Sequence, residues 1–362
     1  MIKSRENQCT HEFFIILQFT IQHLAHNRWF VYHGNERIVK GLMNIPNVLH
    51  IQYPVGQGGL HLGIVGNVAY VYDCGGYGQN VDWNSIFSDI VQHLLKHKCH
   101  YFHIFISHWH YDHCNKLDDL RKYFNEKRID YYTYVPPINT PFQKIAYLCE
   151  FNGSDEEYNN YYNNIMKVDN KDTIKDIPNF LHMHIKQPKT KTLDRLGFQL
   201  SQECNSLFHY GDLNLLLKNM RNLSVQKQVK PRYNIIKHIN RYTNHRYMLC
   251  LYCYTPLNEK SNWLHTGDAT MASKAYRQEM NKHYSSVGLS LKDANIIQIP
   301  HHASRYNHDK NFIDIFDSKY IDFLYYTIEG GRVKTPVVTD IISSGISSSR
   351  IRQVSASPST KI

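Results

Sequence analysis

The side chains best suited to chemistry gather in the segment HWHYDH, residues 108–113, which follows an apolar run at residues 101–106. In an extended backbone, residues two apart project to the same side, so the imidazoles of His108 and His110 can share one metal ion. Asp112 and His113 come next and can bind a second ion close by. Such ligands suit zinc, manganese or iron, and a pair of these ions can activate a water molecule. The segment therefore predicts a hydrolytic metal site at the end of a strand.

Three further segments place polar side chains where apolar runs end. They are VYDCGG at residues 71–76, LHTGD at residues 264–268 and IPHHAS at residues 299–304. Taken alone, Asp73 before two glycines fits a turn, and Asp268 fits the N-cap of a helix that follows it. Either role is compatible with a place beside a metal ion.

Together with residues 108–113, these segments resemble the motifs of the metallo-β-lactamase fold, in the same order. The resemblance implies that Asp73 supports the metal ligands from behind and that Asp268 bridges two ions. It also implies that one of His301 and His302 is the last histidine ligand. We expect His301 in that role because it directly follows a strand, with His302 facing the substrate or packing. Ser304 and Asn307 could donate hydrogen bonds to a phosphate oxygen.

Local details make the sequence most similar to the ComEC-type lactamase domains, which are regarded as nucleases. These details are YPVGQGG at residues 53–59, NHRYML at residues 244–249, and the LHTGD and PHHAS segments. The resemblance spans residues 48–327, with Ala303 where that subgroup has glycine. The membrane channel that accompanies those domains has no counterpart here. We therefore expect a free-standing member, and the resemblance implies no role in DNA import.

The elements expected around these segments alternate between strands and helices. We expect strands at residues 47–53, 60–65, 68–73, 101–106, 131–135, 181–185, 247–254, 263–268, 296–299 and 321–326, and helices at residues 82–98, 117–124, 212–220 and 269–284. With the resemblance, this order implies an α/β fold, a four-layer αββα sandwich of two mixed sheets packed face to face.

The expected domain organisation has three parts. Residues 1–42 form an N-terminal extension of unknown role, residues 43–342 form the hydrolase domain, and residues 343–362 form a mobile serine-rich tail. Within the domain, residues 152–180 are rich in Asn, Asp and Tyr, which predicts a surface insertion.

The charge of the chain favours an anionic partner. Lys and Arg number 41 against 31 Asp and Glu, which gives a formal net charge of +10. Eight of the basic residues and no acidic ones lie between Lys218 and Arg246, with Tyr233 and Tyr242 among them. Such a stretch can neutralise phosphates and stack bases, which predicts nucleic acid or another phosphodiester as the partner. A solvated basic loop is the alternative, and the sequence leaves the oligomeric state open.

The eight cysteines lack the regular spacing of a disulfide framework, which favours a reducing compartment and hence the cytoplasm. Cys250 and Cys253 resemble half of a zinc site, but residues three apart on a strand face opposite sides. No run reaches the about 20 apolar residues of a membrane span, so we expect a soluble protein without membrane insertion.

The leading hypothesis is a metal-dependent hydrolase, a phosphodiesterase or nuclease acting on DNA or RNA. Its cofactors would be two divalent ions, Zn²⁺ first and Mn²⁺ as the alternative. The expected ligands are His108, His110 and one of His301 and His302 for one ion, Asp112 and His113 for the other, with Asp268 as the bridge; Asp112, Asp73 and Ser304 are the residues assigned to catalysis.

Two other functions stay open. One is a small-molecule hydrolase acting on a cyclic or small phosphodiester, a lactone or a thioester. The other is a non-catalytic module that binds nucleic acid. The family's third motif would add a histidine ligand, for which His184 and His209 are the candidates, although each also fits an ordinary strand or loop position.

Overall fold

The computed structural model describes residues 29–33, 36–41, 48–78, 80–168, 177–208, 212–239, 247–255, 261–304, 307, 309, 311–327 and 335–355. The chain divides into two compact units, Met1–Pro46 with Pro256–Glu259, and Asn47–Thr255 with Lys260–Ile362. In the first unit the structure describes an antiparallel hairpin of β1 (Trp29–His33) and β2 (Glu36–Gly41). All other described elements belong to the second unit.

The first sheet of the second unit is mixed and has the strand order β3-β4-β5-β6-β7. Its strands are β3 (Val48–Gln52), β4 (Gly58–Val65), β5 (Val68–Gly76), β6 (Tyr101–Phe105) and β7 (Tyr132–Tyr134). Neighbours are antiparallel from β3 to β5 and parallel from β5 to β7. Because Tyr72 of β5 pairs with Phe105 of β6, Asp73 lies close to the start of residues 108–113, which we call the histidine segment.

The second sheet is also mixed, with the order β13-β12-β11-β10-β9-β8. Its strands are β8 (Leu181–Lys186), β9 (Met248–Cys253), β10 (Trp263–His265), β11 (Ile296–Gln298), β12 (Phe323–Thr327) and β13 (Ile351–Val354). β10 to β13 are parallel, whereas β8 and β9 are antiparallel to their neighbours. Since parallel strands end at the same edge, Asp268 after β10 and the histidine pair after β11 leave the sheet together.

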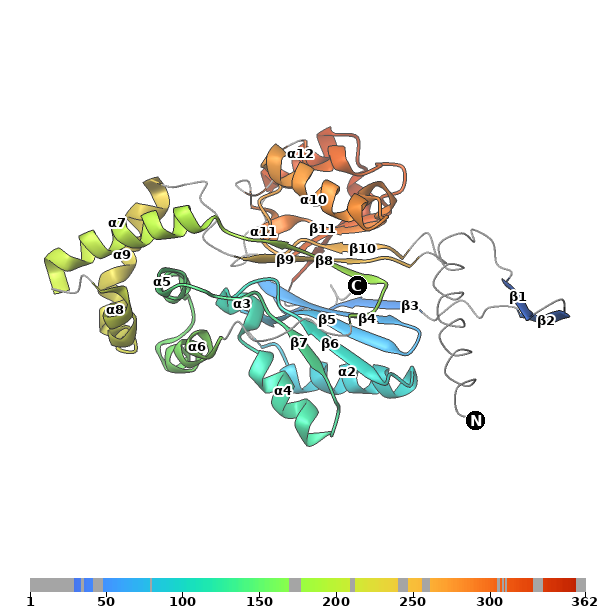
Figure 1. Ribbon diagram of the computed structural model, residues 1–362, viewed down its shortest axis with the longest axis horizontal. Helices are drawn as coiled ribbons and strands as arrows, with labels where there is room; N and C mark the ends of the chain where they lie inside the picture. Colours follow the sequence, from blue (N-terminus) through green and yellow to red (C-terminus); the bar gives the residue numbers. More distant parts are fainter. Residues whose placement is uncertain are drawn as a thin grey trace, which may run out of the picture. The chain divides into compact units, whose positions relative to one another are not determined.

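The two sheets enclose one core, and helices cover their outer faces (Figure 1). Phe105 of the first sheet and Leu251 of the second belong to the buried cluster between them. The outer face of the first sheet packs against α2 (Trp83–Lys96) and α4 (Leu117–Glu126), and that of the second against α10 (Lys274–Ser286) and α12 (Thr335–Ser343). This arrangement confirms the predicted α/β fold with two mixed sheets.

Five further helices form what we call the helical cluster (Figure 1). They are α5 (Pro141–Glu150), α6 (Asp155–Lys167), α7 (Thr190–Phe208), α8 (Leu213–Asn219) and α9 (Leu223–Ile239). α5 contacts each of the other four. Among the five, the sequence pattern predicts only α8, near residues 212–220.

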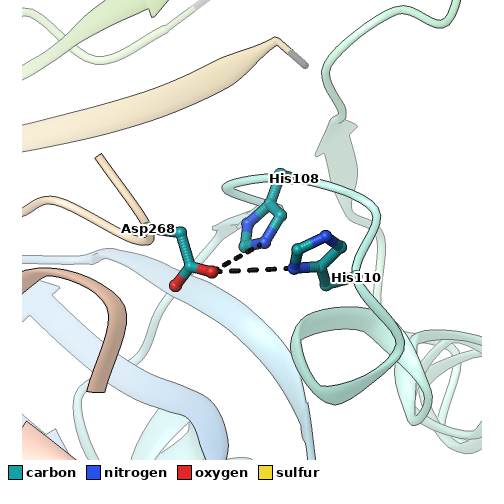
Figure 2. A group of neighbouring side chains, drawn as sticks. All are labelled: His108, His110 and Asp268. Carbon is teal, nitrogen blue, oxygen red and sulfur yellow. Dashed lines mark ion pairs between the residues drawn. The ribbon is translucent and has the colours of Figure 1, made fainter. Parts of the chain in front are cut away.

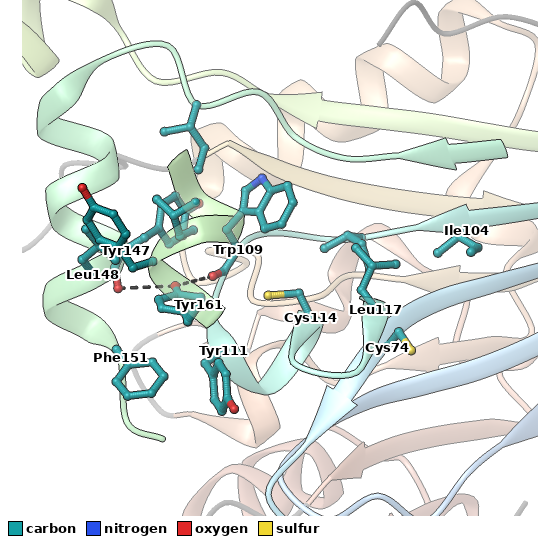
Figure 3. Close-up of a cluster of buried hydrophobic side chains, with 14 of the residues drawn as sticks. Cys74, Ile104, Trp109, Tyr111, Cys114, Leu117, Tyr147, Leu148, Phe151 and Tyr161 are labelled. Carbon is teal, nitrogen blue, oxygen red and sulfur yellow. Dashed lines mark hydrogen bonds between the residues drawn. The ribbon is translucent and has the colours of Figure 1, made fainter. Parts of the chain in front are cut away.

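Within residues 152–180, where we expect a surface insertion, residues 155–167 form α6 with a capping box of Ser154 and Glu157. Three tyrosines of α6 bury their rings and donate their hydroxyl groups to main-chain carbonyls: Tyr158 to Met220, Tyr162 to Leu217 and, as Figure 3 shows, Tyr161 to Trp109. Because each phenol finds an acceptor, tyrosine serves here as a core residue. A sequence pattern that counts tyrosine as polar therefore does not show the helical period of α6.

Within residues 343–362, where we expect a mobile tail, residues 351–354 form the strand β13. β13 pairs in parallel with β12, and Val354 at its end is fully buried. A strand of four residues carries too little alternation to be recognised from its sequence. Residues 356–362 lie outside the described part of the chain.

A histidine cluster lies among aromatic rings between the sheets. His50 Nδ1 is 3.1 Å from His61 Nε2, and His265 Nδ1 is 3.0 Å from the Tyr325 hydroxyl. Burial lowers the pKa of His50 to about 3, and it lowers the pKa values of His61 and His265 well below the ordinary value of 6.5. These imidazoles are therefore neutral inside the folded protein at pH 7.

We expect this cluster to make folding sensitive to acid. Below pH 6.5 the unfolded chain binds protons at these histidines while the folded chain does not, so stability falls as the pH drops from 6.5 toward 3. Each ring contributes up to about 1.4 kcal/mol per pH unit. His61→Phe should flatten the pH dependence of the unfolding free energy, measured by urea denaturation between pH 7 and 4.5. The exposed His100→Gln serves as the control, and an unchanged slope in His61→Phe would contradict the expectation.

Candidate metal centre

Two groups of metal-ligating side chains combine residues that are far apart in the sequence. The first metal group is His108, His110 and Asp268, and the second metal group is Asp112, His113 and His302. Within each group, the nitrogen and carboxylate oxygen atoms that could bind an ion lie within 4.8 Å of one another. The strand ends of the two sheets therefore bring the histidine segment together with residues of the last quarter of the chain.

In the first metal group the nitrogen atoms surround one carboxylate oxygen (Figure 2). Asp268 Oδ2 is 3.3 Å from His108 Nε2 and 3.6 Å from His110 Nδ1. Around a tetrahedral zinc ion with bonds of about 2.0–2.1 Å, ligand atoms lie roughly 3.3 Å apart. The spacing in the group therefore suits a metal ion between the three side chains.

The second metal group has similar spacing and shares Asp268 with the first. Asp112 Oδ2 is 3.1 Å from His302 Nε2 and 3.8 Å from His113 Nε2. The other oxygen of Asp268, Oδ1, lies 3.4 Å from His113 Nε2. One carboxylate thus reaches both groups, which is the arrangement that a bridging ligand requires.

The two histidines after β11 occupy different places in the site, and the expectation that His301 is a ligand stays a prediction. His302 is buried and belongs to the second metal group, whereas the His301 side chain is 27% exposed, with Nε2 3.4 Å from Asp268 Oδ2. The backbone explains this placement, because His301, His302 and Ala303 all have positive φ, between 48° and 61°. This left-handed turn reverses the chain (α11, Pro300–Ala303) and directs the second histidine inward.

Asp73 orients two of the metal-ligating histidines, His113 directly and His108 through Ser107. Its Oδ1 accepts a hydrogen bond from the Ser107 amide at 2.6 Å, and its Oδ2 accepts bonds from the Ser107 hydroxyl at 3.0 Å and from His113 Nδ1 at 2.7 Å. With its proton directed to Asp73, the Ser107 hydroxyl can accept from His108 Nδ1 at 2.9 Å. Both rings therefore carry a proton on Nδ1 and turn Nε2 toward the metal groups.

The electrostatics of the centre favour a bound cation. Burial would raise the pKa values of Asp112 and Asp268, but the surrounding histidines outweigh it and lower both. Burial alone would lower the pKa of His113, yet the carboxylates of Asp73, Asp112 and Asp268 raise it well above its ordinary value. Several negative charges thus share a site that excludes water, and positive charge is needed to balance them.

Buried nitrogen atoms without a hydrogen bond support the same conclusion. His108 Nε2 and His113 Nε2 are both buried and make no hydrogen bond, although carboxylate oxygens lie 3.3 and 3.4 Å away. A buried polar atom left in this state costs about 1–3 kcal/mol. A divalent ion in each metal group would satisfy both atoms, so the residues present fit the metal that the donor set implies.

Four other residues lie at the site, of which the sequence predicts Ser304 and Asn307 but not the remaining two. Ser304 is buried, and its amide closes the turn by donating to the His301 carbonyl. Asn307, expected to face a phosphate, has its Oδ1 2.7 Å from His301 Nδ1. Sequence reasoning missed Gln57, which donates to Asp112 Oδ2 at 3.3 Å, and Glu150, whose Oε2 is 2.5 Å from His110 Nε2. Gln57 lies in the recognised PVGQG segment, whereas Glu150 has no motif around it.

The remaining candidates lie elsewhere. His184 of β8 contacts α10, with its Nε2 3.7 Å from Glu279 Oε1, so it occupies an ordinary strand position. His209 lies outside the described residues. Cys250 and Cys253 belong to buried clusters on opposite faces of β9, as the strand period predicts.

The comparisons with known proteins place the chain in a family. Residues 90–279, which are 190 of the 362 residues, match the model of the "Beta-lactamase superfamily domain". The chain belongs to the β-lactamase superfamily. A similar solved structure is the metallo-beta-lactamase fold protein YhfI from Bacillus subtilis, with 9% identity and a TM-score of 0.40 over 84% of this chain and 95% of that chain. A search of curated proteins found no match.

Membership of the β-lactamase superfamily, together with the two metal groups, indicates a hydrolase that binds metal. None of the helices in the described ranges is long and apolar enough to cross a membrane.

We expect this superfamily member to hold close to two zinc ions per chain, one for each metal group. His302→Ala should keep only the ion of the first group, and His108→Ala only that of the second. Elemental analysis by plasma mass spectrometry after dialysis gives the stoichiometry. His184→Ala, which lies on β8, should retain the wild-type content, and a metal-free wild type would contradict the assignment.

Proposed function

We propose that the chain is a metal-dependent phosphodiesterase that hydrolyses nucleic acid, with zinc as its first metal and manganese as the alternative. The proposal is carried by Asp268, whose two carboxylate oxygens lie 3.3 to 3.6 Å from nitrogen atoms of both metal groups. Two ions held by these residues would supply an activated water and would stabilise the oxygens of an in-line displacement at phosphorus.

The protein residues divide the remaining tasks. His108 and His113 are oriented through Ser107 and Asp73, so that their nitrogen atoms need no rearrangement before an ion binds. Gln57 donates to Asp112 and restrains its carboxylate. The most exposed of the site histidines is His301, whose side chain is 27% exposed, and we propose that the substrate approaches from its side.

The substrate proposal rests on charge and on the ComEC-type resemblance. Lys218 and Arg221 are exposed at the junction of α8 and α9, in a chain of net charge +10. Part of the basic stretch has an internal role instead, since Lys227 pairs with Asp155 and Lys230 donates to the Phe151 carbonyl. Tyr233 is buried, so the expectation that it stacks on bases is wrong. Tyr242, Arg241 and Arg246 lie outside the described residues.

Substitution of a ligand should abolish catalysis. We expect His108→Ala or Asp112→Ala to reduce the hydrolysis rate by on the order of 10³-fold, because a catalytic metal supplies several kcal/mol of transition-state stabilisation. The measurement is a panel of labelled single- and double-stranded DNA, RNA and a chromogenic phosphodiester, with Mn²⁺ and Zn²⁺ in turn. Circular dichroism confirms folding, and His184→Ala is the control. Cleavage of the chromogenic compound alone would favour a small-molecule hydrolase. Full activity of a variant that carries both His108→Ala and Asp112→Ala would exclude the proposed site.

Reversal of the exposed basic charges should weaken binding. For Lys218→Glu with Arg221→Glu, we expect lower affinity for single-stranded nucleic acid and a shallower salt dependence, with the slope of log K against log salt reduced by about 1.4. Fluorescence anisotropy over a salt series measures both. Lys96→Glu with Lys98→Glu changes the net charge equally at the end of α2, where both residues are exposed, and should bind as the wild type does. Equal losses in both variants would show that only net charge matters.

A further inference from the structure

The second histidine of the segment at residues 108–113, His110, contacts a carboxylate from outside the two metal groups. Glu150 is the last residue of α5, and its Oε2 lies 2.5 Å from His110 Nε2. The two side chains are 7% and 16% exposed. Because a carboxylate only accepts hydrogen bonds, Nε2 carries the proton and Nδ1 is the nitrogen available to an ion. That nitrogen is the one 3.6 Å from Asp268 Oδ2.

This contact mirrors the contact between Asp73 and His113. In each metal group, one histidine presents a nitrogen to the ion and its other nitrogen to a carboxylate outside the group. The two supports come from different parts of the fold. Asp73 belongs to β5 at the centre of the first sheet, whereas Glu150 belongs to the helical cluster.

Helix α9 holds the end of α5 that carries Glu150. Gln226 Nε2 donates to the Leu148 carbonyl at 2.9 Å, and Lys230 Nζ donates to the Phe151 carbonyl at 3.1 Å. The Tyr233 hydroxyl donates to Glu150 Oε1 at 3.4 Å. Three side chains on successive turns of one helix therefore secure the residues on both sides of Glu150 and the carboxylate itself.

The helical cluster also holds the backbone next to His110. The Tyr161 hydroxyl lies between two chain segments and donates to the Trp109 carbonyl at 2.6 Å, with the Tyr147 carbonyl 3.4 Å away (Figure 3). The Tyr147 ring meets the His110 ring edge-on at 5.8 Å between centroids. The backbone and the ring of this ligand are thus both positioned by α5 and α6.

We infer that Glu150 is a positioning residue for the first metal group. It fixes the proton and the ring orientation of His110, and through them it sets the affinity of the first group for its ion. The second group, oriented by Asp73, does not depend on it. This inference rests on the proposed metal centre. Carboxylates that orient a metal-binding histidine typically change metal affinity 10–100-fold when removed.

The test measures zinc affinity of the full chain by competition with a chromogenic chelator. Glu150→Ala should weaken one of the two sites about 10–100-fold and leave the other within about twofold. Glu150→Gln, whose amide oxygen can still accept from His110, should lose less. Glu156→Ala, an exposed carboxylate on α6, is the matched control and should bind as the wild type does.

Two single-site backgrounds identify which group is affected. In His302→Ala, the remaining ion lies in the first group, so adding Glu150→Ala should reproduce the loss. In His108→Ala, the remaining ion lies in the second group, so adding Glu150→Ala should change nothing. The melting temperature of each metal-free variant shows whether folding is altered.

Unchanged affinity in the first-group background would overturn the inference while leaving the metal centre intact. Equal weakening in both backgrounds, with a lower melting temperature in the metal-free protein, would also overturn it, because Glu150 would then act only on folding. A wild type that binds no zinc would remove the proposed function and this inference together.

Discussion

The arrangement of the site depends on placing several carboxylates and imidazoles together in a region closed to water. Asp73, Asp112 and Asp268 are all buried, and the Nε2 atoms of His108 and His113 face Asp268 without hydrogen bonds. An uncompensated charge in such a place costs several kcal/mol, so a bound cation would stabilise the arrangement. The depressed pKa values of Asp112 and Asp268 express the same constraint, because the neighbouring histidines keep both carboxylates ionised.

Satisfying this constraint requires strained backbone at the ends of the strands. Asp73 has a φ of 61°, and His301, His302 and Ala303 follow one another in the left-handed region. Non-glycine residues there cost of order 1–3 kcal/mol each unless their surroundings hold them. Here the hydrogen bonds of Asp73 to Ser107 and His113 hold one of them, and the His301 amide bonded to the Gly267 carbonyl holds another. Close packing adds to this, since a side chain at Gly58 would meet the Asp112 carbonyl at 2.3 Å.

The sequence predicts the parts of the fold whose signal is local. β5, β6 and β10 coincide with apolar runs in the sequence. The residues after them have the types and spacing of metal ligands, so the sequence identifies those ligands although it does not show that they converge. Apart from α8, the helices of the helical cluster cannot be predicted in this way. α6 is held by tyrosines whose hydroxyl groups reach main-chain carbonyls of other segments, and α9 contains Pro231 and a basic stretch. Glu150 cannot be predicted in this way either, because its partner His110 is 40 residues away and no spacing rule joins them.

The carboxylates that orient His113 and His110 belong to different parts of the fold, so substitutions can affect the two metal groups separately. The second group takes its histidine orientation from Asp73 on β5, so changes there would disturb the central sheet and the core between the sheets. The first group takes part of its orientation from α5, which packs against the other helices of the helical cluster. Substitutions in α5 or α9 can therefore alter His110 while the sandwich and the second group stay intact. The helical cluster that carries Lys218 and Arg221 is thus also the element through which the first group can be adjusted.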